Sequence, residues 1–508
     1  MIGPHGKPRP PTEPQEVLPK WGWLEIFVLI QYLSTGLLFV PGAQAFRFLI
    51  RALPYASSLG LLFLVAVKTP SRRSRPALKK PVLGDPNNPS VDPDEIRIEP
   101  PPSQKWVKAV LALLVLSLAH PLTEFPAGPA QIIFQLCIAA PVFWVWRKIE
   151  SVPHLRRLVW LMLVANALSV VVGLLQVYYP ARFMPPEFSR VALAMNASRI
   201  EQLSYMGADG RTIIRPPGLS DMPGGAAVAG MTVGFLGVVL ASQVGAKNWQ
   251  RLSCLALAGT GVFILYLTQV RSLMMMMLVA LIAMCFLLWR QKRMAQLVMI
   301  ASLGAALVVG AFVWAVSIGG KSVANRFLGI VEKGAVTSYK ENRGAFLELT
   351  FTRDLPAYPL GAGVGRWGMI AVYFPKEGPL DRDSPYAEIQ LTGWLLDGGV
   401  PMWILYGGAI VVAMMSTYRV AIQRQDLQLS YIAGILFCLN LFIIGQSFAG
   451  PCFNTQLGIQ FWFMVSALHG VACRAPLPSP EPPANKAKPW SQLKSSRLAN
   501  PSKREKGS

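Results

Sequence analysis

The stretch LSCLALAGTGVFILYLTQVRSLMMMMLVALIAMCFLLW, residues 252–289, decides the fold of this chain. One charged residue, Arg271, separates two apolar runs at 252–270 and 272–289. Each run is close to the ~20 residues that an α-helix needs to cross the hydrocarbon core of a bilayer. The stretch therefore predicts two membrane-crossing helices that are joined almost without a loop.

The rest of the chain has the same apolar character. Of its 508 residues 53% are hydrophobic and 15% charged, and the mean hydropathy is +0.40. One soluble core could not bury so much apolar side chain, so lipid is the expected solvent. We predict an all-α integral membrane protein with about twelve transmembrane helices. The expected spans are 21–40, 46–67, 106–120, 130–146, 158–178, 223–243, 252–270, 272–289, 297–318, 400–418, 430–448 and 457–473.

Basic residues gather in the short linkers on one side of these spans. Examples are Arg147 and Lys148 after the fourth span and Arg293 after the eighth. Short cytoplasmic loops are enriched in lysine and arginine, so this side and both termini are predicted to be cytoplasmic. Orientation therefore explains the net charge of +22 better than a nucleic-acid partner does. Arg47 and Arg51, near the outer end of the second span, are local exceptions.

The spans divide the chain into six regions. The N-terminal part is expected to hold a cytoplasmic tail at 1–20, helices at 21–178 with a disordered cytoplasmic loop at 68–105, and a central core of transmembrane helices at 179–318 whose first external loop is 179–222. The remainder is expected to hold a large extracytoplasmic loop at 319–399 between the ninth and tenth spans, helices at 400–473, and a basic disordered cytoplasmic tail at 474–508. The two external loops mix both charge signs with Gly, Pro and aromatic residues, which is typical of folded functional loops. Loops of this length are largely exempt from the charge rule, so their arginines need another explanation.

No metal or cofactor site is predicted. The six cysteines are scattered singly through apolar stretches, without a CxxC pair. This pattern argues against a disulfide framework and against a zinc site.

Arg271 is the first candidate functional residue. On the orientation above it lies at the outer surface, where its guanidinium can present a planar fork of donors to a phosphate or pyrophosphate. The alternative is an interfacial arginine that merely extends to lipid head groups.

The segment RPPGLSDMPGG, 215–225, is the second candidate. Its glycines and prolines precede a span whose free N–H groups can approach an anion, and Arg215 adds charge. The alternative is an ordinary junction between a loop and a helix, with Asp221 as the cap.

The third candidate is the end of the large loop, PLGAGVGR at 359–366 followed by DRDSPYAE at 381–388. The glycine run has no strand–turn–helix context, so a dinucleotide fold is rejected. Arginines and carboxylates concentrated at a membrane boundary can combine a general base with phosphate-binding groups. A solvated charged loop is the alternative.

These features, in this order over residues 215–408, resemble the O-antigen ligase and O-antigen polymerase superfamily of bacterial envelope glycan assembly. The matching segments are Arg215 to Gly218 entering a span, Arg271 and Ser272 opening a later span, Arg343 ahead of the turn from Pro359 to Gly363, and Asp383 to Tyr386 followed by Asp397 and Gly398. One position departs from the family pattern. Ligases of this family carry at the position of Asp383 a histidine that activates the acceptor hydroxyl. Of the four histidines here, only His120 is expected near the outer face.

The resemblance implies a glycosyltransferase of the bacterial cytoplasmic (inner) membrane, acting in O-antigen or exopolysaccharide biosynthesis. The implied donor is an undecaprenyl-diphosphate-linked glycan, used at the outer face without a metal or cofactor. Arg215, Arg271, Arg343 and Arg366 are expected to bind the pyrophosphate. Asp383 or Glu388 is expected to assist the attacking hydroxyl, with Arg271 as the third catalytic residue. Other implied partners are the lipid bilayer and a chain-length regulator or other envelope glycan assembly proteins.

Two other functions stay open. A flippase or transporter of lipid-linked glycans also uses about twelve spans, but it predicts charges at mid-membrane depth in several helices. A non-catalytic member of the superfamily is compatible with the absence of the histidine.

Overall fold

The computed structural model describes residues 21–68, 99–188, 203–368, 370, 374, 387–423 and 426–474. These residues are mostly helical, with one antiparallel two-stranded hairpin. The α-helices and strands are α1 (Trp23–Leu33), α2 (Arg47–Lys68), α3 (Ser103–Leu116), α4 (Ala127–Ala139), α5 (Pro141–Lys148), α6 (Val152–Tyr178), α7 (Pro180–Phe183), β1 (Ser204–Met206), β2 (Thr212–Ile214), α9 (Ala226–Ala241), α10 (Asn248–Leu267), α11 (Arg271–Arg290), α12 (Met294–Lys333), α13 (Ala335–Tyr339), α14 (Ala345–Leu349), α15 (Leu355–Ala357), α17 (Gln390–Ile422), α18 (Leu427–Gln446) and α19 (Gln456–Ala472). The 3₁₀ turns are η1 (Ser34–Phe39), η2 (Ala43–Phe46), η4 (Ser117–Ala119) and η8 (Cys452–Asn454), and the π-helical turns are η6 (Lys340–Gly344) and η7 (Thr350–Asp354).

Eight helices of the described residues are long and apolar enough to cross a membrane, as expected for a multi-pass membrane protein. They are α2 with η2, α4 with α5, α6, α10, α11, α12, α17 and α18. A helix satisfies its own backbone hydrogen bonds, which is why apolar sequence of this length becomes helical in lipid. Two shorter apolar helices, α1 with η1 and α9, accompany them.

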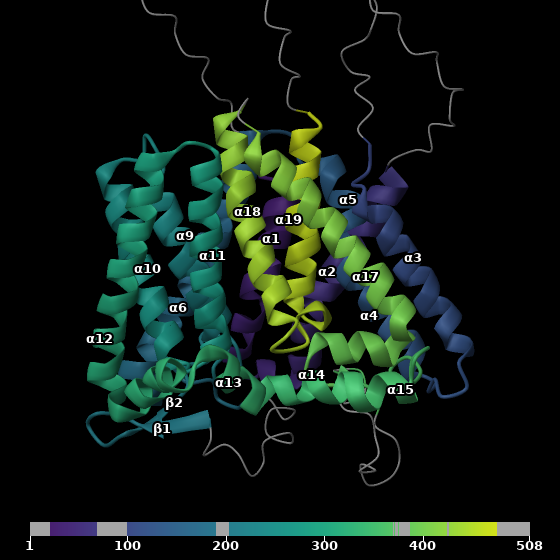
Figure 1. The fold of residues 1–508 in the computed structure, drawn as a ribbon, viewed down its shortest axis with the longest axis horizontal. Helices are drawn as coiled ribbons and strands as arrows, with labels where there is room; N and C mark the ends of the chain where they lie inside the picture. The colour runs from purple at the N-terminus through teal and green to yellow at the C-terminus, as the bar shows by residue number, and fades with distance from the viewer. Residues whose placement is uncertain are drawn as a thin grey trace, which may run out of the picture.

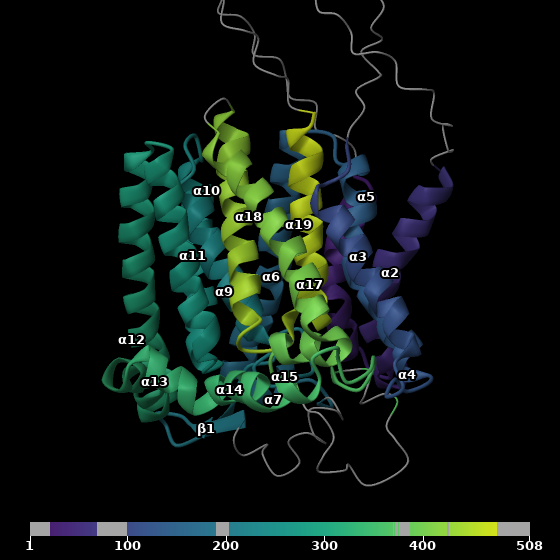
Figure 2. The same ribbon diagram turned by 45° about the vertical axis from the view of Figure 1, so that its right-hand side comes forward.

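The helices form one upright bundle with two different ends (Figures 1 and 2). In Figure 1, α9 to α12 lie on the left, α3 and α4 on the right, and α18 and α19 between them. We call one end the tail face, where α2 ends at Lys68, α5 at Lys148 and α19 at Ala472. The other end is the loop face, where α13, α14, α15 and the β1–β2 hairpin lie across the bundle.

Basic linkers lie on the tail face. They include Arg147 and Lys148 at the end of α5, Lys247 and Arg251 at the start of α10, Arg290 and Arg293 between α11 and α12, and Arg419 near the end of α17. Arg474 donates to the carbonyl oxygen of Trp146 at 2.8 Å. Nε2 of His469 lies 2.9 Å from the backbone carbonyl oxygen of Glu99. The ends of α3, α5 and α19 are therefore neighbours.

Helix α9 forms the centre of the left-hand half, and glycines make its packing possible. A Cβ on Gly230 would lie 2.7 Å from the carbonyl oxygen of Gly261 in α10, and one on Gly237 would lie 2.6 Å from that of Cys254. Lipid tails are as apolar as leucine, so membrane helices associate through such close approach of small residues. This contact holds α10 against α9, and α10 leads directly to Arg271.

Two long helices bend at glycines near the loop face. Helix α12 has a non-helical residue at Gly320 and continues to Lys333, beyond the predicted end of its span at 318. Helix α17 begins at Gln390 and bends at Gly398 and Gly399, before the predicted start at 400. The segment predicted as a loop at 319–399 is thus largely helical where the structure describes it.

Two other segments that were predicted as loops contain regular secondary structure. The predicted loop 179–222 contains the β1–β2 hairpin, a small exception to the all-α prediction. Helix α3 begins at Ser103, inside the loop predicted for 68–105. Residues 1–20, 69–98 and 475–508, which hold most of the predicted disorder, lie outside the described residues.

Candidate functional site

Three arginines from separate segments meet on the loop face. Arg326 interacts electrostatically with both Arg271 and Arg215. We call these three residues the arginine cluster. The sequence predicted two of its members, Arg215 and Arg271, and the structure brings them together.

Arg215 follows strand β2 and is held by backbone contacts. Its N–H donates to the carbonyl oxygen of Leu203 at 3.1 Å, and its own carbonyl accepts from Gly224 at 3.0 Å. The chain then passes the end of α6, where the Gln176 amide both accepts from and donates to the backbone of Gly218, each at 2.8 Å. Gly218 has a φ of +64, and a Cβ there would lie 2.4 Å from Ser169. These contacts therefore fix the position of the loop that carries Arg215.

Arg271 is the first residue of α11. It follows a tight turn from α10, and its Nη1 donates to the hydroxyl of Ser338 in α13 at 3.0 Å. On the other side of this turn the Tyr205 hydroxyl donates to the carbonyl oxygen of Leu267 at 2.9 Å. The hairpin and α13 thus flank the end of α10 and the start of α11.

Arg326 reaches the cluster because α12 bends. Gly320 has a φ of 62 and a ψ of −152, a conformation that only glycine adopts readily. The turn of the β1–β2 hairpin packs against this bend in α12, where the Ala208 N–H donates to the carbonyl oxygen of Ile318 at 2.8 Å. A Cβ on Gly320 would lie 3.1 Å from the backbone of Ala208.

Within the part of the chain that the structure describes, no carboxylate neutralises the positive charge of the cluster. Among the described residues, none of the three guanidinium groups has an ion-pair partner. The Nε atoms of Arg215 and Arg326 are buried and lack a hydrogen-bond partner there. Burial lowers the pKa of Arg215, and the nearby Tyr205 acts in the opposite direction. Unpaired donors and like charges at one site favour binding of a multiply charged anion.

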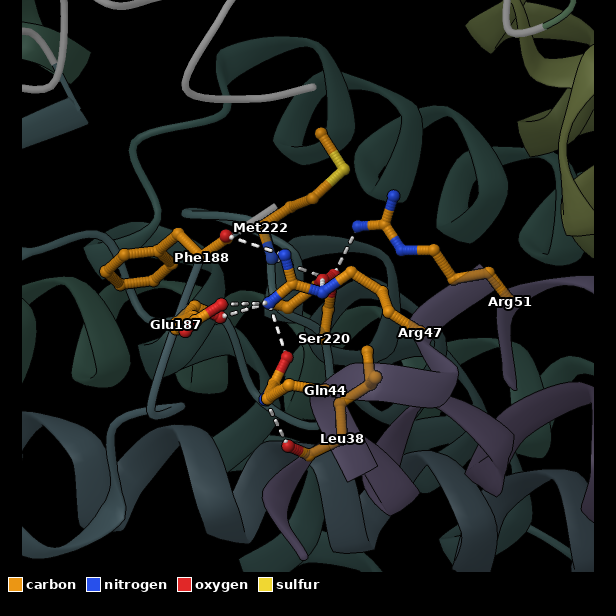
Figure 3. Close-up of polar contacts among 9 residues, drawn as sticks. Leu38, Gln44, Arg47, Arg51, Glu187, Phe188, Ser220 and Met222 are labelled. Carbon is orange, nitrogen blue, oxygen red and sulfur yellow. Dashed lines mark hydrogen bonds and ion pairs between the residues drawn. The ribbon is translucent and has the colours of Figure 1, made fainter. Parts of the chain in front are cut away.

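A second group of charges surrounds Asp221, only 1% exposed, on the loop that carries Arg215. Its carboxylate contacts Nη2 of Arg51 at 2.5 Å and Nε of Arg47 at 3.5 Å. Arg47 also donates to the carbonyl oxygens of Glu187 and Phe188, each at 3.2 Å. Figure 3 shows both guanidinium groups turned toward the segment of Ser220 and Met222. The two arginines that were exceptions to the charge rule are thus counterions of a buried carboxylate.

The remaining predicted site residues form pairs of opposite charge. Arg343 makes an ion pair with Glu388, and Nε of Arg366 lies 3.4 Å from Oε1 of Glu124. Two predicted pyrophosphate ligands thus have carboxylate partners, and one predicted catalytic carboxylate is paired. Asp383 lies outside the described residues.

The glycine-rich turn at 359–365 is packed between two parts of the bundle. Its backbone bonds to the bend in α17, with the Ala362 N–H 2.7 Å from the carbonyl oxygen of Leu396. Gly363 has a φ of +95, and a Cβ there would lie 2.5 Å from the backbone of Leu122. This turn has a structural role, and it carries Arg366 to Glu124.

The position of Asp397 is also structural. It is 1% exposed in α17, next to this turn, and accepts a hydrogen bond from Gln131 at 3.1 Å. Asp397 is therefore a buried carboxyl group that contacts α4.

His120 lies at the loop-face end of the segment that follows α3. Its Nδ1 accepts a hydrogen bond from the N–H of Leu122 at 3.2 Å.

Arg326 was missed by the sequence analysis. Arg326 falls in the region predicted as a loop. Its place beside Arg215 and Arg271 depends on the continuation of α12 past the predicted end of its span. The signal available was the pair Gly319 and Gly320 followed by further helical sequence, because paired glycines permit a bend.

No group of three or more His, Cys, Asp and Glu side chains that could hold a metal ion occurs in the described part of the chain. A comparison of the sequence with models of known protein families and with characterised proteins found no match.

Proposed function

We propose that this chain is an integral membrane glycosyltransferase of the O-antigen ligase or polymerase type. It transfers saccharide from an undecaprenyl-diphosphate-linked donor to a second glycan, lipid or protein acceptor. The observation that supports this proposal is the arginine cluster of Arg215, Arg271 and Arg326, at the loop-face ends of membrane-crossing helices.

The position of the cluster suits a lipid-linked diphosphate. The polyprenyl tail of such a donor lies in hydrocarbon, so its diphosphate lies at the depth where these helices end. Guanidinium groups bind phosphate oxygens through two parallel hydrogen bonds. Three such groups held before the reaction stabilise the charge that develops on a leaving diphosphate.

The orientation follows from the same proposal. The tail face, with its basic linkers, is the cytoplasmic side by the positive-inside rule. The loop face is then the outer side of the bacterial cytoplasmic membrane, with about twelve spans between the two.

In the proposed reaction the bond between the sugar C1 and the diphosphate oxygen breaks as the bond between C1 and the acceptor oxygen forms. The acceptor proton passes to a carboxylate, and undecaprenyl diphosphate leaves with the bonding electron pair. Asp383 and Glu388 are the proposed bases. In the structure Glu388 forms an ion pair with Arg343.

The first test uses complementation of a strain that lacks the gene. Arg271→Ala and Asp383→Ala variants that reach the membrane are expected to produce shortened or absent surface polysaccharide. Arg211→Ala is the matched control, because Arg211 is an exposed loop-face arginine paired with Asp209. Normal polysaccharide length from both site variants would overturn the assigned roles.

A second test separates the proposal from the two other functions. The purified protein is incubated with a lipid-linked oligosaccharide in detergent, and the product is analysed by mass spectrometry. Elongation or transfer is expected. Translocation of the same lipid across vesicles without transfer would indicate a flippase, and neither activity would indicate a non-catalytic member.

A further inference from the structure

The turn between α10 and α11 has an unusual backbone conformation. Gln269 has a φ of 56, and only one other non-glycine residue of the described chain, Lys292, has a positive φ. Gln269 follows the last residues of α10, where a left-handed residue is common and is usually glycine. A glutamine in this conformation is strained, and such strain persists where contacts of the residue compensate for it, often at functional sites.

The side chain of Gln269 connects two segments of the arginine cluster. Gln269 is 4% exposed, and its Nε2 donates to the hydroxyl of Ser322 in α12 at 3.1 Å. Gln269 is two residues before Arg271, and Ser322 is one helical turn before Arg326. Residues one turn apart share a helix face, so Ser322 and Arg326 lie on the same face of α12.

Such a connection is needed because the arginines repel one another. Arg326 experiences the positive charges of Arg271 and Arg215. In the described part of the chain no carboxylate pairs with any of them, so neutral contacts must keep the segments together. The bond between Gln269 and Ser322 joins the turn before Arg271 to the helix of Arg326.

We infer that Gln269 is a positioning residue whose amide, bonded to Ser322, sets the spacing of Arg271 and Arg326 for one diphosphate group. The inference rests on the proposed function, because it takes the arginine cluster as the diphosphate site.

The test measures the affinity of the purified full chain, in detergent micelles, for farnesyl diphosphate by isothermal titration calorimetry. Gln269→Gly keeps the turn conformation but removes the amide, and Ser322→Ala removes the hydroxyl. Each is expected to weaken binding about fivefold, as the loss of one neutral hydrogen bond does. The double variant is expected to bind like either single variant, because the two residues act through one contact.

Two controls distinguish positioning from general destabilisation. Lys292→Gly relieves the same kind of backbone strain at the tail-face end of α11, and binding is expected to be unchanged. Ser322→Thr keeps the hydroxyl and is expected to restore affinity to within twofold of wild type. Thermal unfolding of all variants shows whether each remains folded.

The outcomes separate this inference from the proposed function. If wild type binds, and Arg271→Ala and Arg326→Ala bind more weakly, unchanged affinity in Gln269→Gly and Ser322→Ala overturns the positioning role alone. If wild type does not bind farnesyl diphosphate, or if neither arginine variant weakens binding, the anion site itself is overturned, and the proposed function loses its support.

Discussion

Replacing Asp221 by alanine is expected to destabilise the protein by about 3 kcal/mol. Removing one partner of a buried ion pair usually costs about 3–5 kcal/mol, because the remaining charge loses its counterion. Asp221 is 1% exposed, and the side chains of Arg47 and Arg51 are 15% and 16% exposed. The lower end of the range applies because Arg47 retains its contact with Glu187 at 3.5 Å, whereas Arg51 keeps no ion-pair partner among the described residues.

The measurement is unfolding by titration of sodium dodecyl sulfate into detergent micelles, followed by circular dichroism. Asp209→Ala is the control, since Asp209 and Arg211 form an ion pair whose side chains are 48% and 71% exposed. That variant is expected to unfold at the same detergent fraction as wild type, because exposed ion pairs contribute little to stability.

A triple variant tests the physical cause. Arg47→Gln, Arg51→Gln and Asp221→Asn together leave no buried charge unpaired, so most of the lost stability is expected to return. The reasoning is refuted if Asp221→Ala unfolds within about 0.5 kcal/mol of wild type, or if the triple variant is no more stable than Asp221→Ala.

Three further predictions concern the loop face. Gly363→Ala is expected to cost more than about 2 kcal/mol in the same titration, because the new Cβ would lie 2.5 Å from backbone atoms and this clash adds to the strain of a positive φ. The control is Gly210→Ala, at a φ of +78 with nothing within 4 Å, which is expected to cost only about 1 kcal/mol. Gln176→Leu leaves the buried N–H and carbonyl of Gly218 unpaired, so a loss of about 2 kcal/mol or more is expected, and equal stability would contradict this role. Arg326→Gln is expected to weaken farnesyl diphosphate binding about tenfold and to reduce its dependence on salt, measured by calorimetry between low and physiological ionic strength; an unchanged salt dependence would exclude Arg326 from the site.

The membrane character of the chain could be predicted from local sequence. Runs such as 252–270 and 272–289 must become helices in lipid, because no water is present there to satisfy backbone groups. Where these helices end was harder to predict. The bends at Gly320 and Gly399 allow helix to continue past the expected boundaries, and a glycine in a sequence does not reveal whether it bends a helix.

For the candidate site, the sequence by itself singled out Arg215 and Arg271, because arginines at outer span ends are not explained by orientation. Only the tertiary structure added Arg326, since its position depends on the bend in α12 and on the hairpin that docks there. Only the structure paired Arg343 with Glu388, residues that lie far apart in the chain. The local sequence shows which residues are charged and with which sign. Which charges neutralise each other and which remain unpaired depends on contacts between distant segments, because only the packing of the helices establishes those contacts.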